Sequence, residues 1–93
     1  MLQDQKSLMM PHHVIMEDRK KLSVSGVQDV DSFDESTVVL YTNMGKMTVR
    51  GVNLHVNAFD VAGGDFSMEG DILGLDYSDE KKEKQSFLTR LFR

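Results

Sequence analysis

Apolar and polar residues alternate in short runs along this chain, and three of these runs resemble one another closely. Residues 22–26 (LSVSG), 47–51 (MTVRG) and 66–70 (FSMEG) each read apolar, hydroxyl, apolar, polar, glycine. Alternation with a period of two is typical of a strand with one buried face, and a glycine after such a run indicates a bend or a β-bulge. The pattern predicts a protein held together by similar β units.

The firmest local prediction is a β-hairpin made by residues 37–42 and 46–50. The first segment (TVVLYT) consists of β-branched residues, Leu and Tyr, all of which favour strands. Asn43-Met44-Gly45 then predicts a tight loop with Gly45 in the left-handed region. Farther along, the alternation changes phase between Ala58 and Phe59, which indicates a β-bulge near this point.

The remaining runs complete an all-β fold. We expect a small antiparallel meander of six or seven short strands, arranged as one sheet, a sandwich or a solenoid-like stack, with a short C-terminal amphipathic helix. The apolar positions of the alternating runs predict the core: Val38, Leu40, Met47, Val49, Leu54, Val56, Phe59 and Phe66. A chain of 93 residues forms one domain, and so small a core favours self-association to cover a face or an edge of the sheet.

The two ends of the chain differ from the middle. Residues 1–11 are polar with scattered Met and predict a flexible lead-in, residues 12–77 form the β domain, and residues 78–93 form a charged linker and the helix. Apolar residues of the last segment fall on one face of that helix, with basic residues around them. The helix is too short to be stable alone in water, so it needs a surface: its own sheet, a sister subunit, or an anionic membrane. The candidate docking residues are Phe87, Leu88, Arg90, Leu91 and Phe92.

Composition narrows the functional class. A net charge of −4 argues against nucleic-acid binding, which needs a basic surface. The sequence has no Cys, hence no disulfide framework and no thiolate site, and no apolar run approaches the ~20 residues of a membrane helix. The first residues lack the basic-then-apolar order of a signal peptide, so we expect an intracellular protein.

Candidate chemistry in the sequence is sparse. His12, His13 and His55 have no spacing that is typical of a metal site, and the acidic residues at 29, 31, 34 and 35 lack the glycine and glutamate of a calcium loop. Gly63, Gly64 and Gly70 suit turns and bulges rather than a phosphate-binding loop. We therefore expect no enzyme, no catalytic residue, no metal and no cofactor. The alternative is a small-ligand or metal-binding β module that uses His55 and the acidic cluster.

Longer motifs carry a family resemblance. The pattern His13-x-x-Met16-x-x-Arg19-x-x-Leu22-x-Val24-Ser25-Gly26-Val27 is followed by Leu40-x-Thr42-x-x-Gly45-x-Met47-x-Val49-x-Gly51 and, later, by Gly70-x-Ile72-x-x-Leu75-x-Tyr77. Over about residues 12–77 the chain resembles the YabP/YqfC sporulation protein family, and its length and Phe-Leu-x-x-Leu-Phe ending resemble the YabP members more.

The resemblance implies a non-enzymatic protein of endospore-forming bacteria that is made in the mother cell and contributes to spore envelope development. It implies no catalytic residues. Together with the sequence patterns it leads us to expect a homo-oligomeric scaffold or adaptor in the mother-cell cytoplasm. Its expected partner is a membrane-associated sporulation protein or an anionic membrane surface, which would place it peripherally at the forespore membrane.

Overall fold

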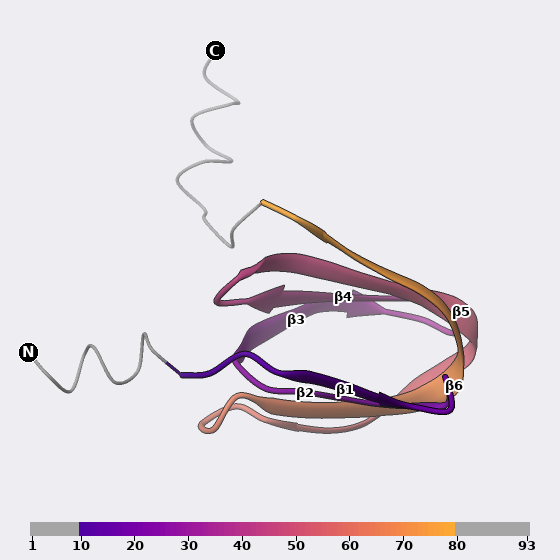
Figure 1. Cartoon of the computed structure of the whole chain (residues 1–93), viewed down its shortest axis with the longest axis horizontal. Coiled ribbons are helices and arrows are strands. Elements are labelled where there is room, and N and C mark those ends of the chain that lie inside the picture. Colours follow the sequence, from indigo (N-terminus) through magenta and orange to yellow (C-terminus); the bar gives the residue numbers. More distant parts are fainter. Residues whose placement is uncertain (1–9, 80–93) are drawn as a thin grey trace, which may run out of the picture.

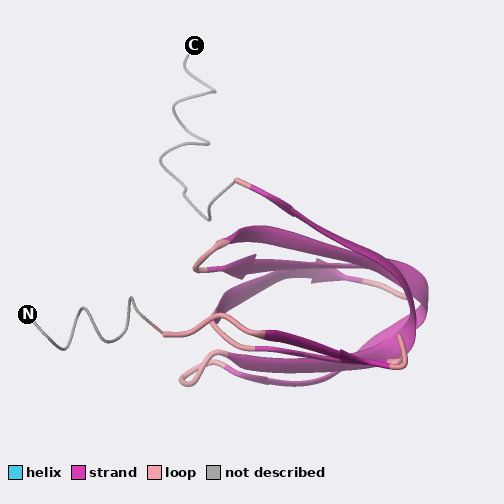
Figure 2. Ribbon diagram, viewed as in Figure 1, coloured by secondary structure: helices cyan, strands magenta, loops and turns pink. Residues whose placement is uncertain are grey.

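A computed structural model describes residues 10–79, and these residues form strands joined by turns (Figure 2). The strands are β1 (Val14–Glu17), β2 (Lys21–Val24), β3 (Val27–Phe33), β4 (Thr37–Thr42), β5 (Gly45–Asp60) and β6 (Asp65–Ser78). They make one antiparallel sheet in the order β1-β2-β6-β5-β4-β3. The all-β prediction is therefore confirmed for this part of the chain. The expected C-terminal helix lies outside the described residues.

The sheet folds over on itself because β5 and β6 are long and curved (Figure 1). The second half of β5 and the first half of β6 lie beside β2 and β1 and form one layer with them. The other halves lie beside β4 and β3 and form the opposite layer. We call these the β1 layer and the β3 layer. Neighbouring copies of the repeated motif pair antiparallel, Leu22 with Met68 and Val24 with Phe66, which rules out a solenoid-like stack.

Irregular positions produce the bend. The pairing of β5 with β6 shifts register at three places, between Arg50 and Gly51, between Val52 and His55, and between Val56 and Ala58. Strands that pass from one layer to another do so at such bulges. The predicted bulge near Ala58 is confirmed. The described residues form six strands, which agrees with the predicted number of six or seven. The predicted shortness was wrong for the two longest strands, β5 and β6, because a bulge at a glycine bends a strand without ending it.

Two loops close over the bend. The amides of Gly51 and Leu54 donate to the carbonyls of Ser36 and Glu35, in the turn between β3 and β4, at 3.0 and 2.9 Å. At the matching place on β6, the amide of Gly70 donates to the Lys20 carbonyl at 2.9 Å. Backbone groups that the bulges remove from the ladder are thus paired with the turns, as buried backbone requires.

The core lies between the two layers. The apolar residues of the three repeated motifs are all buried, and Val27, Val38, Leu40, Leu54 and Ile72 join them. Six of the eight predicted core residues are buried, whereas Val56 and Phe59 are partly buried and pack against the cluster. The predicted hairpin is also confirmed, with Thr42 opposite Gly45 and a φ of 119° at Gly45.

Candidate functional site

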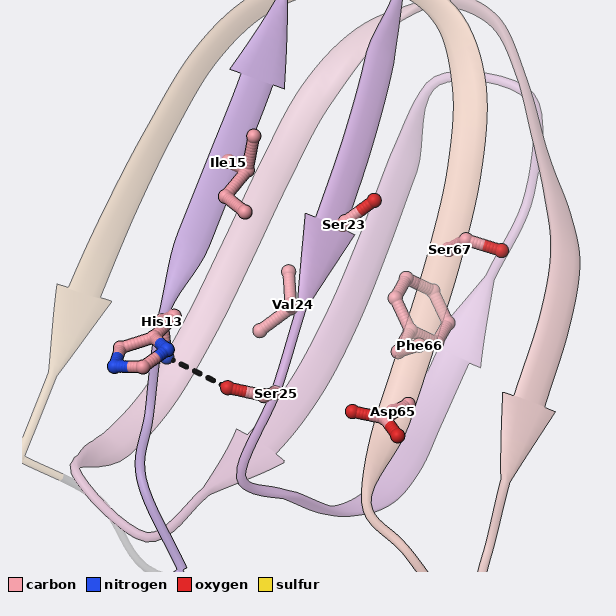
Figure 3. A pocket seen from close by; sticks show the side chains of 8 residues that line it. All are labelled: His13, Ile15, Ser23, Val24, Ser25, Asp65, Phe66 and Ser67. Atoms are coloured by element: carbon pink, nitrogen blue, oxygen red, sulfur yellow. Dashed lines mark hydrogen bonds between the residues drawn. The ribbon is translucent and has the colours of Figure 1, made fainter.

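A candidate surface among the described residues is the outer face of the β1 layer. A shallow depression of about 310 Å³ lies on this layer, where β1, β2 and β6 run side by side (Figure 3). Ser23 and Ser67 are direct cross-strand partners, and their short side chains leave the surface low between them. Ile15, opposite Ser23, is 57% exposed. The lining residues are His13, Ile15, Ser23, Val24, Ser25, Asp65, Phe66 and Ser67.

Ser25 fixes the rim of the depression. Its hydroxyl accepts a hydrogen bond from the His13 amide at 2.8 Å and donates one to the Pro11 carbonyl at 3.0 Å. Its own amide donates to the His13 carbonyl at 2.9 Å. These bonds hold the segment before β1 against the end of β2, so the depression has an ordered border made of polar groups.

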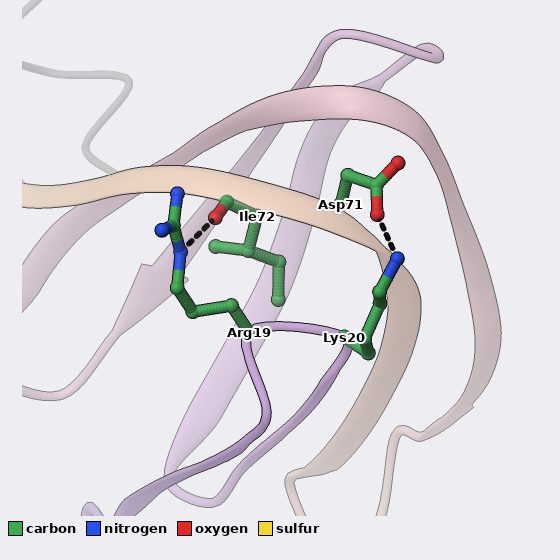
Figure 4. Close-up of polar contacts among 4 residues, drawn as sticks. All are labelled: Arg19, Lys20, Asp71 and Ile72. Atoms are coloured by element: carbon green, nitrogen blue, oxygen red, sulfur yellow. Dashed lines mark hydrogen bonds and ion pairs between the residues drawn. The ribbon is translucent and has the colours of Figure 1, made fainter.

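A second polar cluster occupies the turn between β1 and β2 (Figure 4). Asp18 and Arg19 both have a φ of 54°, which matches the type I′ turn favoured in two-residue hairpins. The Arg19 Nε donates to the Ile72 carbonyl at 3.0 Å, and Lys20 forms an ion pair with Asp71. Both partners of that ion pair are well exposed, so it adds little stability. The cluster attaches the hairpin of β1 and β2 to the bend of β6, so its role is structural.

A second hollow, of about 250 Å³, lies at the end of the sandwich opposite the bend, where Gly26, Asn43 and Gly64 come together. The side-chain Nδ2 of Asn43 donates to the Met10 carbonyl at 2.5 Å. The Asn43 Oδ1 is buried, with no hydrogen-bond partner within residues 10–79. Both chain ends leave the described fold at this end, next to the loop between β4 and β5 (Figure 1).

The three histidines occupy separate places. The His12 Nδ1 donates to the Ser25 carbonyl at 2.8 Å, and in the neutral ring Nε2 then accepts from the Tyr77 hydroxyl at 2.7 Å. Partial burial raises the pKa of that hydroxyl above its ordinary value. His13 borders the depression, and His55 lies on β5 opposite Glu69. Within residues 10–79 no group of three or more His, Asp or Glu side chains is placed to hold a metal ion.

Asp34 of the acidic cluster stabilises the turn between β3 and β4. Asp34 accepts hydrogen bonds from the amides of Ser36 and Thr37 at 2.8 and 2.9 Å and from the Ser36 hydroxyl at 3.1 Å. These donors, the Ser36 amide above all, lower the pKa of Asp34. Asp29 and Asp31 lie on β3, and the carbonyl of Glu35 helps to cover the bend. Among the described residues, His55 and the acidic side chains do not form a group of three or more that could hold a metal ion.

The glycines that were assigned to turns and bulges are found there. Gly64, with a φ of 77°, ends the turn between β5 and β6, and Gly70, with a φ of 142°, lies at the bend of β6. The predicted docking residues Phe87, Leu88, Arg90, Leu91 and Phe92 lie outside the described residues. The described residues contain no helix that is long and apolar enough to cross a membrane.

Sequence reasoning missed the outer face of the β1 layer as a candidate surface. The signal was present in the repeated motif, whose second position is a hydroxyl residue in all three copies: Ser23, Thr48 and Ser67. In the first and third copies these hydroxyls face each other across β2 and β6. Only the pairing of the strands makes one surface of them.

Two comparisons with known proteins agree with the sequence motifs. The family model described as the YabP family matches residues 9–84, nearly the whole chain. A search of curated proteins finds the spore protein YabP of Bacillus subtilis (strain 168), which is 40% identical over 84 residues. The match covers 88% of this chain and 84% of that protein.

Proposed function

This chain belongs to the YabP family of sporulation proteins, and from that premise we propose that it acts as a non-enzymatic, self-associating scaffold or adaptor in spore envelope development. The observation that carries the proposal is the set of open strand edges that the folded sheet leaves. Among the described residues, β1 pairs with β2 alone and β3 with β4 alone. Open edges of this kind are templates for pairing with another chain.

Apolar side chains accompany these open edges. Ile15 on β1 is 57% exposed and Phe33 on β3 is 62% exposed. Charges on an edge strand oppose pairing with another chain, and β3 carries Asp29 and Asp31. The exposed apolar side chains beside the edges are therefore the groups that favour a role in assembly. A scaffold or an adaptor uses such surfaces, with no need for a reaction centre.

The C-terminal segment supplies the second contact of the proposed adaptor. Strand β6 ends at Ser78, opposite Lys46 and beside the loop between β4 and β5. The docking residues Phe87, Leu88, Arg90, Leu91 and Phe92 follow within fifteen residues of that point. We assign them to a membrane-associated sporulation protein or to an anionic membrane surface, which would hold the protein peripherally at the forespore membrane in the mother cell.

The test replaces the spore protein YabP of Bacillus subtilis with this chain fused to a fluorescent protein. We expect the full chain to collect at the forespore and a chain that ends at Ser78 to spread through the mother cell. The double variant Phe87→Ser and Leu91→Ser should behave like the truncation, and Thr89→Ser serves as the matched control. Localisation and spore yield that survive the truncation would refute the docking role.

A further inference from the structure

We propose that the outer face of the β1 layer is a self-complementary surface that binds a second copy of this chain. This inference rests on the proposed self-association and adds a face-to-face contact to the open edges named above. The observation behind it is the order of charges across the four strands of the layer, which follows directly from the pairing register.

The first row of this face carries alternating charges. Glu17 pairs with Lys21, Lys21 with Glu69, and Glu69 with His55, so the row crosses β1, β2, β6 and β5. Their side chains are exposed or half-buried. The row reads carboxylate, ammonium, carboxylate, imidazole. Read backwards, it presents a complementary group at every position.

Two further rows are also complementary to their own reverse. The middle row is Ile15, Ser23, Ser67 and Ala58, which is small or apolar throughout. The third row lies at the end of the layer away from the bend. Its members, from β1 to β5, are His13, Ser25, Asp65 and Asp60.

A two-fold axis that runs parallel to the strands, midway between β2 and β6, makes each row meet its own reverse. Lys21 then faces Glu69 of the second copy, and Glu17 faces its His55. In the third row, His13 faces Asp60 and Ser25 faces Asp65. Sheets that pack face to face keep their strands nearly aligned, as this axis requires, and a two-fold contact uses the same patch on both copies.

The competing axis, perpendicular to the strands, fits worse. It would place Glu69 against Asp65 of the second copy and so bring two carboxylates together on the central strand β6. Like charges that meet across an interface are costly. The outer face of the β3 layer is not self-complementary in charge. A two-fold axis parallel to its strands sets Arg50 against the uncharged Thr37 of the second copy. The charge order therefore selects one face and one orientation.

The size of the patch sets the expected strength. The patch is four strands wide, at about 4.8 Å for each strand, and its three rows extend about 17 Å along the strands, which gives a footprint of about 300 Å². A standard stable interface buries about 800 Å² on each partner, so this contact alone should give a weak, concentration-dependent dimer. The central serines leave room for bridging water, which interfaces tolerate.

A charge swap at the centre tests the proposal on the full chain. Sedimentation velocity from about 10 µM to 1 mM measures the dissociation constant. Lys21→Glu alone should weaken the dimer about tenfold or more, because symmetry turns two attractions into two repulsions. Glu69→Lys alone should do the same. An equimolar mixture of the two variants should associate as a heterodimer, since every Glu then faces a Lys.

Two controls separate the interface from the fold. The double variant Lys21→Glu with Glu69→Lys restores opposite charges between positions 21 and 69, both within the sheet and across the axis, but sets position 21 against Glu17 on β1. It should therefore recover most of the dimerisation that either single variant loses. Arg50→Glu disrupts a cross-strand ion pair of 2.9 Å with Asp76 on the other layer and should leave association unchanged. A thermal melt of each variant establishes that it is folded.

The outcomes distinguish this inference from the proposed function. A dimer that ignores both single charge reversals, or a mixture that fails to associate, overturns the assigned face while leaving self-association in place. A loss of association in Arg50→Glu would move the interface to the β3 layer. A chain that stays monomeric at 1 mM overturns both the face and the self-association.

Discussion

Replacing Gly70 with Ala should strongly destabilise the fold, because this glycine lies at the bend of β6 in a conformation that other residues avoid. Its φ is 142°, and a Cβ there would lie 2.7 Å from both the Asn53 carbonyl oxygen and the Leu54 Cα. Both neighbours are backbone atoms of the facing strand, and Leu54 is part of the core. Neither can move without opening the bend.

The magnitude follows from two costs. A non-glycine residue in a sparsely populated backbone region costs about 1–3 kcal/mol. Forcing an extra methyl group into a packed site costs about 1–3 kcal/mol more. We expect a loss of about 2–6 kcal/mol, a large part of the ~5–15 kcal/mol that holds a typical domain together. At about 4–8 °C for each kcal/mol, the melting temperature should fall by about 8 °C or more.

Gly74 on the same strand is the matched control. A Cβ at Gly74 meets no heavy atom within 4 Å, and its φ lies outside the left-handed region. Gly74→Ala should therefore leave stability unchanged or raise it by up to about 1 kcal/mol, because alanine restricts the unfolded chain. Urea unfolding, followed by circular dichroism, measures both variants. Equal midpoints for Gly70→Ala and Gly74→Ala would refute the bend geometry.

Two further predictions concern the turn and the core. Asp34→Ala should lower the free energy of unfolding at pH 7. The folded turn lowers the pKa of Asp34, so its carboxylate stabilises the fold at any pH above the ordinary Asp pKa of about 3.9. The difference from the unmodified chain should vanish as the pH falls through the lowered pKa of the folded state. The same urea series with Asp31→Ala is the control, and a difference that persists undiminished at pH 2 would contradict the assignment. Leu40→Ala should cost about 2–5 kcal/mol by leaving a cavity in the core, whereas Met44→Ala, at a position 66% exposed, should cost little. Equal losses for Leu40→Ala and Met44→Ala would contradict the placement of the core.

Sequence patterns predicted the parts of the fold that depend on local alternation. The hairpin of β4 and β5 follows from β-branched residues around a tight loop, and the burial of the three repeated motifs follows from their period of two. What local alternation could not predict is the continuity of β5 and β6. A glycine after a strand pattern is compatible with an end or with a bulge, and the choice depends on partners that lie far away in the sequence.

Ile72 and Leu73 illustrate the consequence. In the sequence, Leu73, Leu75 and Tyr77 alternate as one apolar face of a strand would, yet Ile72 is buried and Leu73 is 63% exposed. The register places Arg50 opposite Gly74 and Gly51 opposite Ile72, which leaves Leu73 as the extra residue. A bulge reverses the side to which the following residues point. Its position comes from the facing strand, so the sequence of β6 alone cannot reveal it.

The candidate surface was hidden for the same reason. Its central pair, Lys21 and Glu69, is separated by more than forty residues, and neither residue stands out in its own segment. Charges that look scattered along the chain become an ordered row only when β2 pairs with β6. By contrast, the acidic cluster and the histidines are conspicuous in the sequence, and the structure uses Asp34 and His12 to hold turns and strand ends in place.

One bulge connects the core with this surface. Asn57 is the extra residue where β5 pairs Val56 with Met68 and Ala58 with Ser67. Without it, strict alternation from Val56 would turn Phe59 outward and Ala58 inward. With it, Phe59 packs against Phe66 with the ring centres 6.3 Å apart, and Ala58 and Asp60 take their places in the outer rows. The position of a single residue therefore decides both how the core closes and which groups a second copy would meet.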